Sequence, residues 1–405
     1  MPEQTFMPST QTVFERIGEN TLVVNMGPQH PSTHGVLRLI CEMEGETVVN
    51  IEPVIGYLHT GMEKEGEYLQ YLKVVTMTDR MDYMSANGNN LVYTLAVEKL
   101  LNLEVPPRGQ VLRVLLCELS RIASHLVWLG TSALDLGAMT PFFWCFRERE
   151  KILDMFEMFS GVRMMPSWIV PGGLRGDMPA GFDKLLVPFI KEFPDALSEI
   201  EGLLVDNPIW KERTIGVGVV TVEECMAFGL SGPIIRGSGL EWDIRKSNPY
   251  SGYEQYDFAI PVSKKGDVYA RFLVRLAEMR ESLKIIQQAF EGLPEGPWNS
   301  DDRKVVPPPR EELDTSMESL IHHFKLWTEG YRVPPGEAYA AIEGPKGELG
   351  CYVVSDGSNR PYRFHMRPSS FMNLQGLKKM CVGRLIADVV AIIGSIDIVL
   401  GEIDR

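Results

Sequence analysis

The chain has 405 residues, of which 44% are hydrophobic and 23% are charged, and its formal net charge is −14 at pH 7. This composition is ordinary for a globular protein with a large core. The acidic balance argues against nucleic acid as a partner, because phosphate neutralisation needs clustered Lys and Arg, and no such run occurs. The six cysteines are scattered without a CxxC pair, which favours a reducing compartment over disulfides.

The N-terminal segment, residues 1–16, is predicted to be a flexible leader. It has neither a basic n-region nor an apolar h-region, so we expect no secretory signal. No uninterrupted apolar run reaches the roughly 18 residues that a membrane-spanning helix needs. We therefore expect a soluble chain.

The elements that follow predict a single α+β domain over residues 17–405. Short runs rich in Val, Leu and Ile within 20–55 predict strands, because Gly and Pro separate them. A helix is predicted from Thr78 or Asp79 to a stop before Pro106, and the nearly all-apolar helix that follows is expected to be buried on all sides. This apolar helix spans 109–137, and further helices are predicted from 140, at 180–204 and at 266–292.

The C-terminal part is predicted to return to strands. The Pro-rich stretch 305–313 indicates a loop, because it separates helical from strand-like patterns. Three strands are predicted within 337–368, and a helix is predicted over 370–394. We expect a β-rich part at 20–55, a helical core at 62–295 and an α/β part at 310–405.

The stretch GPQHPSTHG, residues 27–35, contains two histidines four residues apart, His30 and His34. Pro31 disfavours helix at His30, so the pair cannot share a helix face as metal ligands do. A metal would also need a third ligand, and the sequence offers no second cluster, so we expect no metal site. Two interpretations remain: the histidines stabilise a tight turn, or one imidazole hydrogen-bonds or protonates a ligand.

The long apolar helix carries a charged stripe formed by Glu118, Arg121 and His125. Charges on a buried helix are costly unless they are paired, so the stripe is either a structural network or one face of a redox or ligand site. Asp135 is a further carboxylate among apolar neighbours. In RMDY, the helix dipole favours an acidic residue such as Asp82 in the first turn of a helix. Tyr83 is either a buried phenol that hydrogen-bonds to a partner or a phenol near a ligand, to which it donates a proton.

Taken together, eight blocks carry a resemblance to a known family. They are NMGPQHPSTHGVLRL, GYLHTGMEK, RMDY, ELSRIASHLVWLG, TPFFWCFRERE, YSGYE, LGCYVVSDGSNRPYR and DIVLGEIDR. From about residue 20 to Arg405 the chain resembles the 49-kDa-type, quinone-reducing subunit of respiratory complex I, the D-type subunit of bacterial NADH–quinone oxidoreductase. This family is related to the large subunit of nickel–iron hydrogenases. The resemblance implies a hydrogenase-like fold, with a central helical bundle and small β-sheets from the N- and C-terminal regions.

The hydrogenase nickel ligands are missing from this chain. Where a hydrogenase has four cysteine thiolates, the matching positions here are Asp82, Ser85, Val399 and Glu402. Nickel coordination of that kind needs soft sulfur ligands, so a hydrogen-activating centre is excluded. The resemblance implies that the former metal cavity is a quinone pocket.

The resemblance also implies roles for individual residues. Tyr83 matches the tyrosine that donates a hydrogen bond to one quinone carbonyl, and His34 matches its partner at the head group. Asp135 matches the carboxylate that bonds this histidine and resupplies its proton. Arg80 and His125 match a pair beside the terminal iron–sulfur cluster of a partner subunit, where they would tune its potential.

Three further positions in the family blocks have no assigned role. His30 and His59 belong to the same family blocks. The family usually has an arginine where this chain has Val170, and we expect a local change in the pocket or in subunit contacts there.

Quinone reduction takes two electrons and two protons, which a phenol and an imidazolium at the two carbonyls could supply. The electrons must come from a cluster that this chain cannot build, because its cysteines are not grouped. The resemblance implies a subunit of a proton-translocating NADH–quinone oxidoreductase that is inactive alone and binds no cofactor by itself. The alternative is a non-catalytic scaffold subunit of the same peripheral arm.

The resemblance further implies an obligate hetero-oligomer. Its partners would be the B-type iron–sulfur subunit, the C-type and I-type peripheral-arm subunits, and membrane-arm subunits at the quinone entry. The complex would hold the chain at the cytoplasmic side of the bacterial inner membrane as a peripheral subunit.

Overall fold

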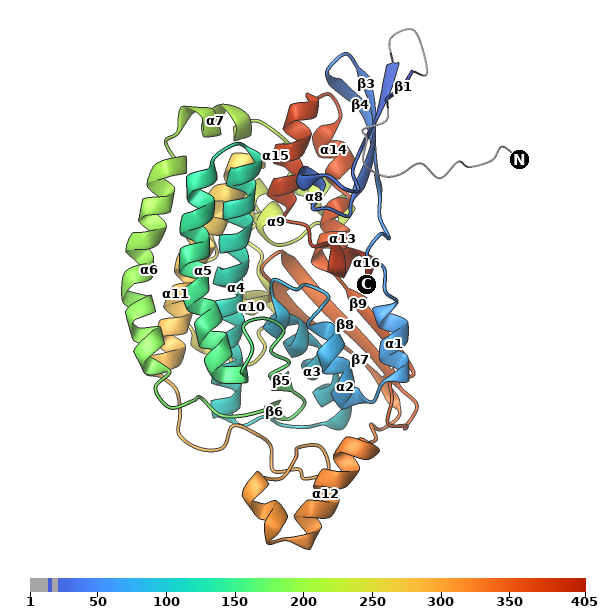
Figure 1. Cartoon of the computed structure of the whole chain (residues 1–405), viewed down its shortest axis with the longest axis vertical. Coiled ribbons are helices and arrows are strands. Elements are labelled where there is room, and N and C mark those ends of the chain that lie inside the picture. Colours follow the sequence, from blue (N-terminus) through green and yellow to red (C-terminus); the bar gives the residue numbers. More distant parts are fainter. Residues whose placement is uncertain (1–13, 17–20) are drawn as a thin grey trace, which may run out of the picture.

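The N-terminal part of the chain is an antiparallel sheet. The computed structural model describes residues 14–16 and 21–405. Most of the predicted leader lies outside these residues, but Phe14–Arg16 form β1, which pairs with β2. The sheet has the order β1-β2-β3-β4, which confirms the strands predicted in this region (Figure 1). The other strands are β2 (Thr21–Met26), β3 (Arg38–Glu44) and β4 (Thr47–Val54).

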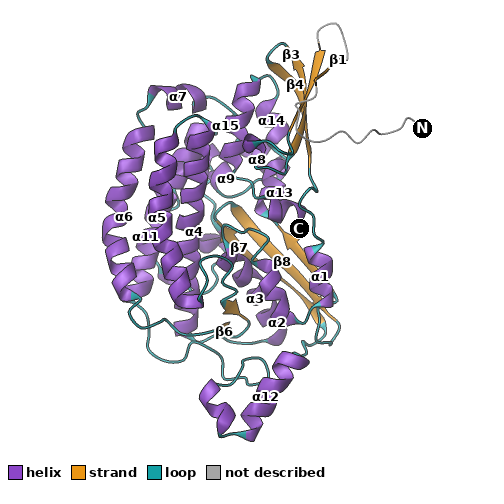
Figure 2. Cartoon of the chain, in the orientation of Figure 1, coloured by secondary structure: helices purple, strands orange, loops and turns teal. Residues whose placement is uncertain are grey.

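A bundle of long helices forms the centre of the molecule (Figures 1 and 2). The nearly all-apolar helix is α4, 29 residues long, and it packs against α5 and α11. Most of its side chains are buried on every face, as the sequence predicted. The remaining long helices also follow the predictions closely. The bundle consists of α4 (Pro107–Asp135), α5 (Met139–Ser160), α6 (Asp183–Leu204) and α11 (Val268–Glu291).

The prediction that a helix starts at Thr78 or Asp79 is wrong. Helix α2 (Tyr71–Thr78) ends there, and α3 (Ala86–Leu101) begins only after a turn over residues 79–85. The backbone N–H of Met84 donates to Asp82 Oδ1 (3.1 Å), and the Asn89 side chain donates to the Asp82 carbonyl (2.9 Å). Such side-chain bonds compete with helical ones, and they stabilise the turn here. RMDY therefore lies in a turn between two helices.

A second sheet follows the bundle in the sequence and packs against α3, while α1 (Met62–Tyr68) lies along its edge strand β9. All its neighbouring strands are antiparallel. Its strands are β7 (Gly336–Gly344), β8 (Gly347–Ser355) and β9 (Arg363–Arg367).

The helix predicted over 370–394 is broken into three. Gly383 adopts a positive φ of 81°, and its N–H donates to the carbonyl of Val48 in β4 (2.8 Å). The Val48 N–H in turn donates to the Arg384 carbonyl (2.8 Å), so these backbone groups bind the N-terminal sheet instead of continuing a helix. The resulting helices are α13 (Ser369–Leu374), α14 (Leu377–Cys381) and α15 (Ile386–Ile396), followed by α16 (Leu400–Asp404).

Shorter elements complete a mixed fold of helices and small antiparallel sheets, which confirms the α+β class. In the described part of the chain, no helix is long and apolar enough to span a membrane. The predicted Pro-rich loop leads into a 3₁₀ helix, η3, and then α12, which projects from the body in Figure 1. These elements are η1 (Pro31–Thr33), β5 (Ile169–Val170), β6 (Gly173–Leu174), α7 (Pro208–Thr214), α8 (Val222–Phe228), α9 (Pro233–Ser238), α10 (Ile244–Ser247), η2 (Tyr253–Gln255), η3 (Arg310–Asp314) and α12 (Met317–Thr328).

Two hydrophobic clusters form the core. One joins the bundle to the β7–β9 sheet, and the other lies between the N-terminal sheet and the C-terminal helices α13–α16. The candidate site contains residues from both of these packed units.

Candidate functional site

The histidine loop is a tight turn that His30 stabilises from within. Its Nδ1 accepts the Ser32 N–H (3.2 Å) at the start of η1, and the Thr33 hydroxyl donates to its carbonyl (3.0 Å). Gly27 is required beside it, because a Cβ there would lie 2.1 Å from the Leu37 carbonyl oxygen. The structural interpretation of His30 is therefore confirmed.

His34 ends the same loop in a different state. It has a left-handed backbone (φ 56°), and its side chain is exposed to solvent. Burial by the surrounding protein, together with the positive charge of Lys346, nevertheless lowers its pKa to about 4. The ring is therefore neutral at pH 7.

Tyr83 is half-buried in the turn between α2 and α3. The C-terminal helix α16 packs directly against it, since a Cβ added to Gly401 would lie 3.1 Å from Tyr83 Cε1 and 2.5 Å from the Met81 carbonyl oxygen. Burial and the negative charge of Asp82 raise the pKa of the phenol. Tyr83 therefore keeps its proton in this chain at neutral pH.

A buried ammonium group, that of Lys346, affects the pKa of both candidate donors. It lies in the turn between β7 and β8, is 1% exposed, and donates to both Asp82 oxygens (3.1 and 3.2 Å) and to Ser124 Oγ (2.9 Å). Its positive charge acts on the pKa of both His34 and Tyr83. The charge of Lys346 thus acts to lower the pKa of both groups, but among the described residues no hydrogen bond joins Tyr83 to His34.

Sequence reasoning missed Lys346. A lysine in the turn sequence Gly344-Pro345-Lys346-Gly347 is typical of an exposed hairpin residue. The one available signal was the pair of acids, Asp82 and Glu402, at two of the positions that resemble hydrogenase thiolates, because buried acids require a cation nearby.

Asp135 lies at the last turn of α4 and is partly buried, which raises its pKa to about 6. It lines a cavity of about 10 Å³ together with Ser132, Trp128 and Ser395. Within residues 14–16 and 21–405, no hydrogen bond joins Asp135 to His34, although α15 contacts both α4 and η1. The exchange of a proton between the two residues stays a prediction.

Arg80 and His125 occupy different environments. Arg80 is exposed and donates to the Thr76 carbonyl, whereas His125 is completely buried and its Nε2 lies 3.0 Å from Glu278 Oε2. Burial lowers the pKa of His125 to about 4, so a neutral ring donates to an ionised carboxylate. Arg80 and His125 thus have different partners, and in the described part of the chain no hydrogen bond joins them. Their placement beside a partner's cluster stays a prediction.

The charged stripe on α4 is part of a buried structural network. Glu118 accepts from Arg121 (3.2 Å), Arg245 (3.1 Å) and the Tyr253 hydroxyl (2.6 Å). Arg121 also donates to the Gly344 carbonyl (3.0 Å), at the turn that carries Lys346. Glu118 and Arg121 therefore form a structural network, the first of the two interpretations left open by the sequence, and a role of the stripe beside a redox or ligand site stays a prediction.

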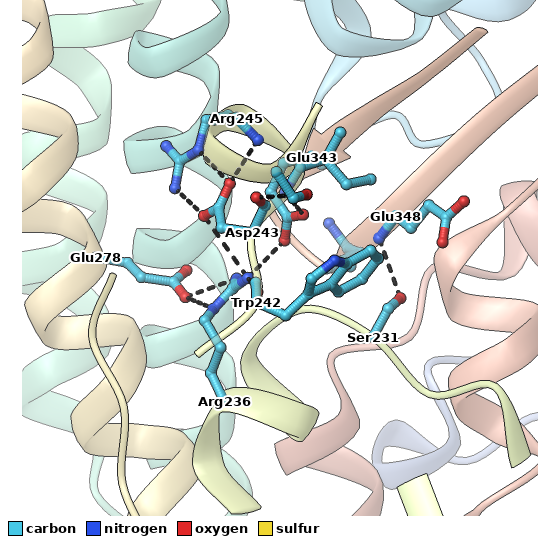
Figure 3. Close-up of polar contacts among 12 residues, drawn as sticks. Ser231, Arg236, Trp242, Asp243, Arg245, Glu278, Glu343 and Glu348 are labelled. Atoms are coloured by element: carbon cyan, nitrogen blue, oxygen red, sulfur yellow. Dashed lines mark hydrogen bonds and ion pairs between the residues drawn. The ribbon is translucent and has the colours of Figure 1, made fainter. Parts of the chain in front are cut away.

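The same network continues away from α4, as Figure 3 shows. Arg236 lies 2.8 Å from Glu278 and 2.7 Å from Glu343, and Arg245 lies 2.7 Å from Asp243. Because positive and negative groups alternate along this network, few of its buried ions lack a partner of opposite charge.

The segment that departs from the family pattern, residues 170–174, forms the β5–β6 hairpin. Arg113 donates to the Val170 carbonyl (2.9 Å) and pairs with Glu98 (2.6 Å), which accepts the Gly172 N–H (2.8 Å). Val170 and Leu174 line a cavity of about 640 Å³ with residues 297–310. The altered block therefore lies on a cavity wall, apart from Tyr83.

Comparisons with known proteins agree with this picture. Residues 135–405, more than half of the chain, match the family described as respiratory-chain NADH dehydrogenase, 49 Kd subunit. A D-type subunit of NADH-quinone oxidoreductase from Chloroflexus aurantiacus is 56% identical, with all of both chains covered. A D-type subunit from Roseiflexus sp. is 58% identical over 96% of this chain and 94% of its own. The D-type subunit of Geotalea uraniireducens is 53% identical over 95% of this chain and 98% of its own.

These similarities define a class of respiratory-chain subunits. The chain belongs to the family of 49-kDa subunits of NADH dehydrogenase, whose bacterial relatives here are named as D-type subunits of NADH-quinone oxidoreductase. The resemblance found in the sequence is confirmed.

Proposed function

We propose that this chain forms the quinone-reduction site of a proton-translocating NADH–quinone oxidoreductase, together with a B-type iron–sulfur subunit. Electrons would pass from the partner's terminal cluster to the quinone, and this chain would supply protons. Its other partners would be the C-type, I-type and membrane-arm subunits. The chain would then be a peripheral subunit at the cytoplasmic side of the bacterial inner membrane, inactive by itself and related in fold to the hydrogenase large subunit.

One observation carries this proposal: a phenol and an imidazole, Tyr83 and His34, lie in the field of the same buried cation, Lys346. The two side chains come from segments about fifty residues apart, and both remain reachable by solvent. Two hydrogen-bond donors near one positive charge suit a substrate whose two oxygens become negative on reduction.

The geometry gives each donor its own state. Tyr83 is protonated and can donate its O–H to one carbonyl oxygen of the quinone. His34 is a neutral imidazole in this chain and not the imidazolium that the sequence suggested, because its pKa is about 4. It would donate an N–H to the other oxygen and relay a proton from Asp135, whose pKa of about 6 lies near neutrality.

The partner would have to complete the pocket. The crevice that Tyr83 lines with Ser120, Arg149 and Met165 has a volume of about 20 Å³. That is space for a single water molecule and not for a quinone head group. Arg80, exposed at the same turn, would then face the partner's cluster.

The test compares two activities of the assembled complex. Tyr83→Phe and His34→Ala should each abolish most quinone reduction, while reduction of an artificial electron acceptor by the upstream cofactors stays intact. Quinone reduction that survives both substitutions would favour the alternative, a scaffold subunit without a catalytic role.

A further inference from the structure

Arg149 is a buried cation without a partner anion. It lies on α5 and is 9% exposed, and in residues 14–16 and 21–405 none of its N–H groups donates a hydrogen bond and no carboxylate pairs with it. The adjacent Glu150 is an ion-pair partner of Arg163 (2.6 Å) instead. Burial lowers the pKa of Arg149, although the charge of Glu150 acts in the opposite direction. A charge that is buried in this way is strongly unfavourable unless a partner compensates it.

Other buried arginines of the described chain differ from Arg149. Arg113 and Arg245 are each paired with a buried carboxylate. Arg275 lacks such a pair, but it is 0% exposed and its guanidinium carbon lies 4.2 Å from the centre of the Trp128 ring, so no other protein can reach it. Arg149, in contrast, borders a crevice, and a second protein can supply the missing anion there.

The crevice beside Arg149 is the one that Tyr83 also lines. Nε of Arg149 is completely enclosed, so the two Nη groups at the tip of the side chain are the part that faces the crevice. The volume of the crevice is about 20 Å³. This is room for a water molecule or for the end of one side chain, and not for a quinone. The anion that the guanidinium needs must therefore be small or be the end of a side chain.

The wall of the crevice that faces α5 is apolar and partly exposed. Met164, Met165 and Pro166 form it, and Met164 is 39% exposed. We call these three residues, together with Arg149, the docking face. A free inorganic ion would neutralise Arg149 but would leave the apolar side chains in water. Arginine and methionine are both enriched in protein interfaces, so the docking face suits a protein surface that carries one acidic side chain.

We propose that the docking face binds a neighbouring subunit of the complex, which places one Asp or Glu carboxylate in the crevice against Arg149. The guanidinium donates two parallel N–H bonds to this carboxylate, a geometry that arginine favours. Apolar side chains of the same subunit cover Met164, Met165 and Pro166. That this neighbour is the B-type iron–sulfur subunit rests on the proposed function, because the crevice adjoins Tyr83.

The first test measures how fast this chain dissociates from the assembled complex after dilution, by size-exclusion chromatography. Arg149→Met would leave the partner's carboxylate buried and unpaired, so dissociation should be at least about 30-fold faster. Arg149→Lys keeps the charge but not the two parallel bonds, and its rate should lie between those of Arg149→Met and wild type. Arg147→Met is the matched control on the same helix, because Arg147 is exposed and pairs with Glu148 of its own chain. Its rate should stay within about threefold of wild type.

The stability of the free chain separates docking from a structural role. In the free chain Arg149 has no anion to lose, so Arg149→Met should leave the free energy of unfolding unchanged or raise it. Urea unfolding of the full-length chain measures this. An arginine with a structural role would instead lower the free energy of unfolding when it is replaced.

A charge reversal identifies the partner's acid. Arg149→Glu should prevent stable assembly, since two carboxylates would then face each other. Replacing the partner's Asp and Glu residues by Lys, one at a time, should restore assembly at one position. Loss of assembly in Arg149→Glu that no such replacement restores would overturn the proposal.

The results also separate this inference from the proposed function. If Arg149→Met dissociates at the wild-type rate, or if it destabilises the free chain, the docking role is wrong, and the proposed function still stands when Tyr83→Phe abolishes quinone reduction. If Arg149→Met dissociates faster as expected and Tyr83→Phe has no effect, the docking face is correct and the proposed function fails.

Discussion

Replacing Lys346 with Met should destabilise the chain by about 3–5 kcal/mol, the usual cost of breaking a buried ion pair. Methionine nearly fills the space of the lysine stem but removes three donors, which now bind Asp82 at 3.1 and 3.2 Å and Ser124 at 2.9 Å. The carboxylate of Asp82, 3% exposed, would remain without its cation. Most of the cost is therefore the uncompensated charge on Asp82 and not lost packing.

A double-mutant cycle checks this origin. Adding Asp82→Asn to Lys346→Met removes the stranded charge, so the pair of substitutions should cost about 2–3 kcal/mol less than the sum of the single ones. Urea unfolding of the full-length chain at pH 7 gives all four free energies of unfolding. Additive single effects, or a cost below about 1 kcal/mol for Lys346→Met, would refute the reasoning.

Three further predictions concern Gly401, His125 and Arg113. Gly401→Ala should lower kcat for quinone reduction about tenfold or more and leave the rate with artificial acceptors unchanged. The added methyl would lie 2.5 Å from the Met81 carbonyl oxygen and 3.1 Å from Tyr83 Cε1, so the turn that carries Tyr83 would have to move. The pKa of His125 falls from 6.5 to about 4 on folding, so its contribution to stability is complete above pH 6.5. The free energy of unfolding should fall by about 3 kcal/mol as pH falls toward 4. Urea unfolding at several pH values measures this loss, which should be smaller in His125→Gln. Arg113→Met should cost about 3–5 kcal/mol in the same assay, since Glu98 would remain buried and unpaired; a cost below 1 kcal/mol would contradict this.

The regular elements could be predicted because their patterns are local. The apolar run of α4 and the alternating strands around Leu39 and Cys41 follow from burial alone. Two predictions failed where side chains or distant strands bind the backbone. Asp82 stabilises a turn where helix was expected, and the pairing of Gly383 and Arg384 with Val48 interrupts the C-terminal helix. Neither interaction leaves a periodic signal.

The site could be predicted only in part. The family resemblance points to Tyr83 and His34, and the charge of one buried lysine, Lys346, acts on the pKa of both. The sequence alone could not identify Lys346, because its importance depends on its ion pair with Asp82, which lies 264 positions away in the sequence. It also could not choose between the interpretations of Glu118 and His125, since the paired residues Arg245 and Glu278 are more than a hundred positions away.

The central claim is that Tyr83 and His34 bind the quinone head group. A structure of the assembled complex with bound quinone tests it directly. The account predicts the Tyr83 hydroxyl and a His34 ring nitrogen within hydrogen-bond distance of the two carbonyl oxygens, with the partner's cluster on the Arg80 side of the turn. A head group bound elsewhere, with Tyr83 and His34 both out of reach of its oxygens, would contradict the account.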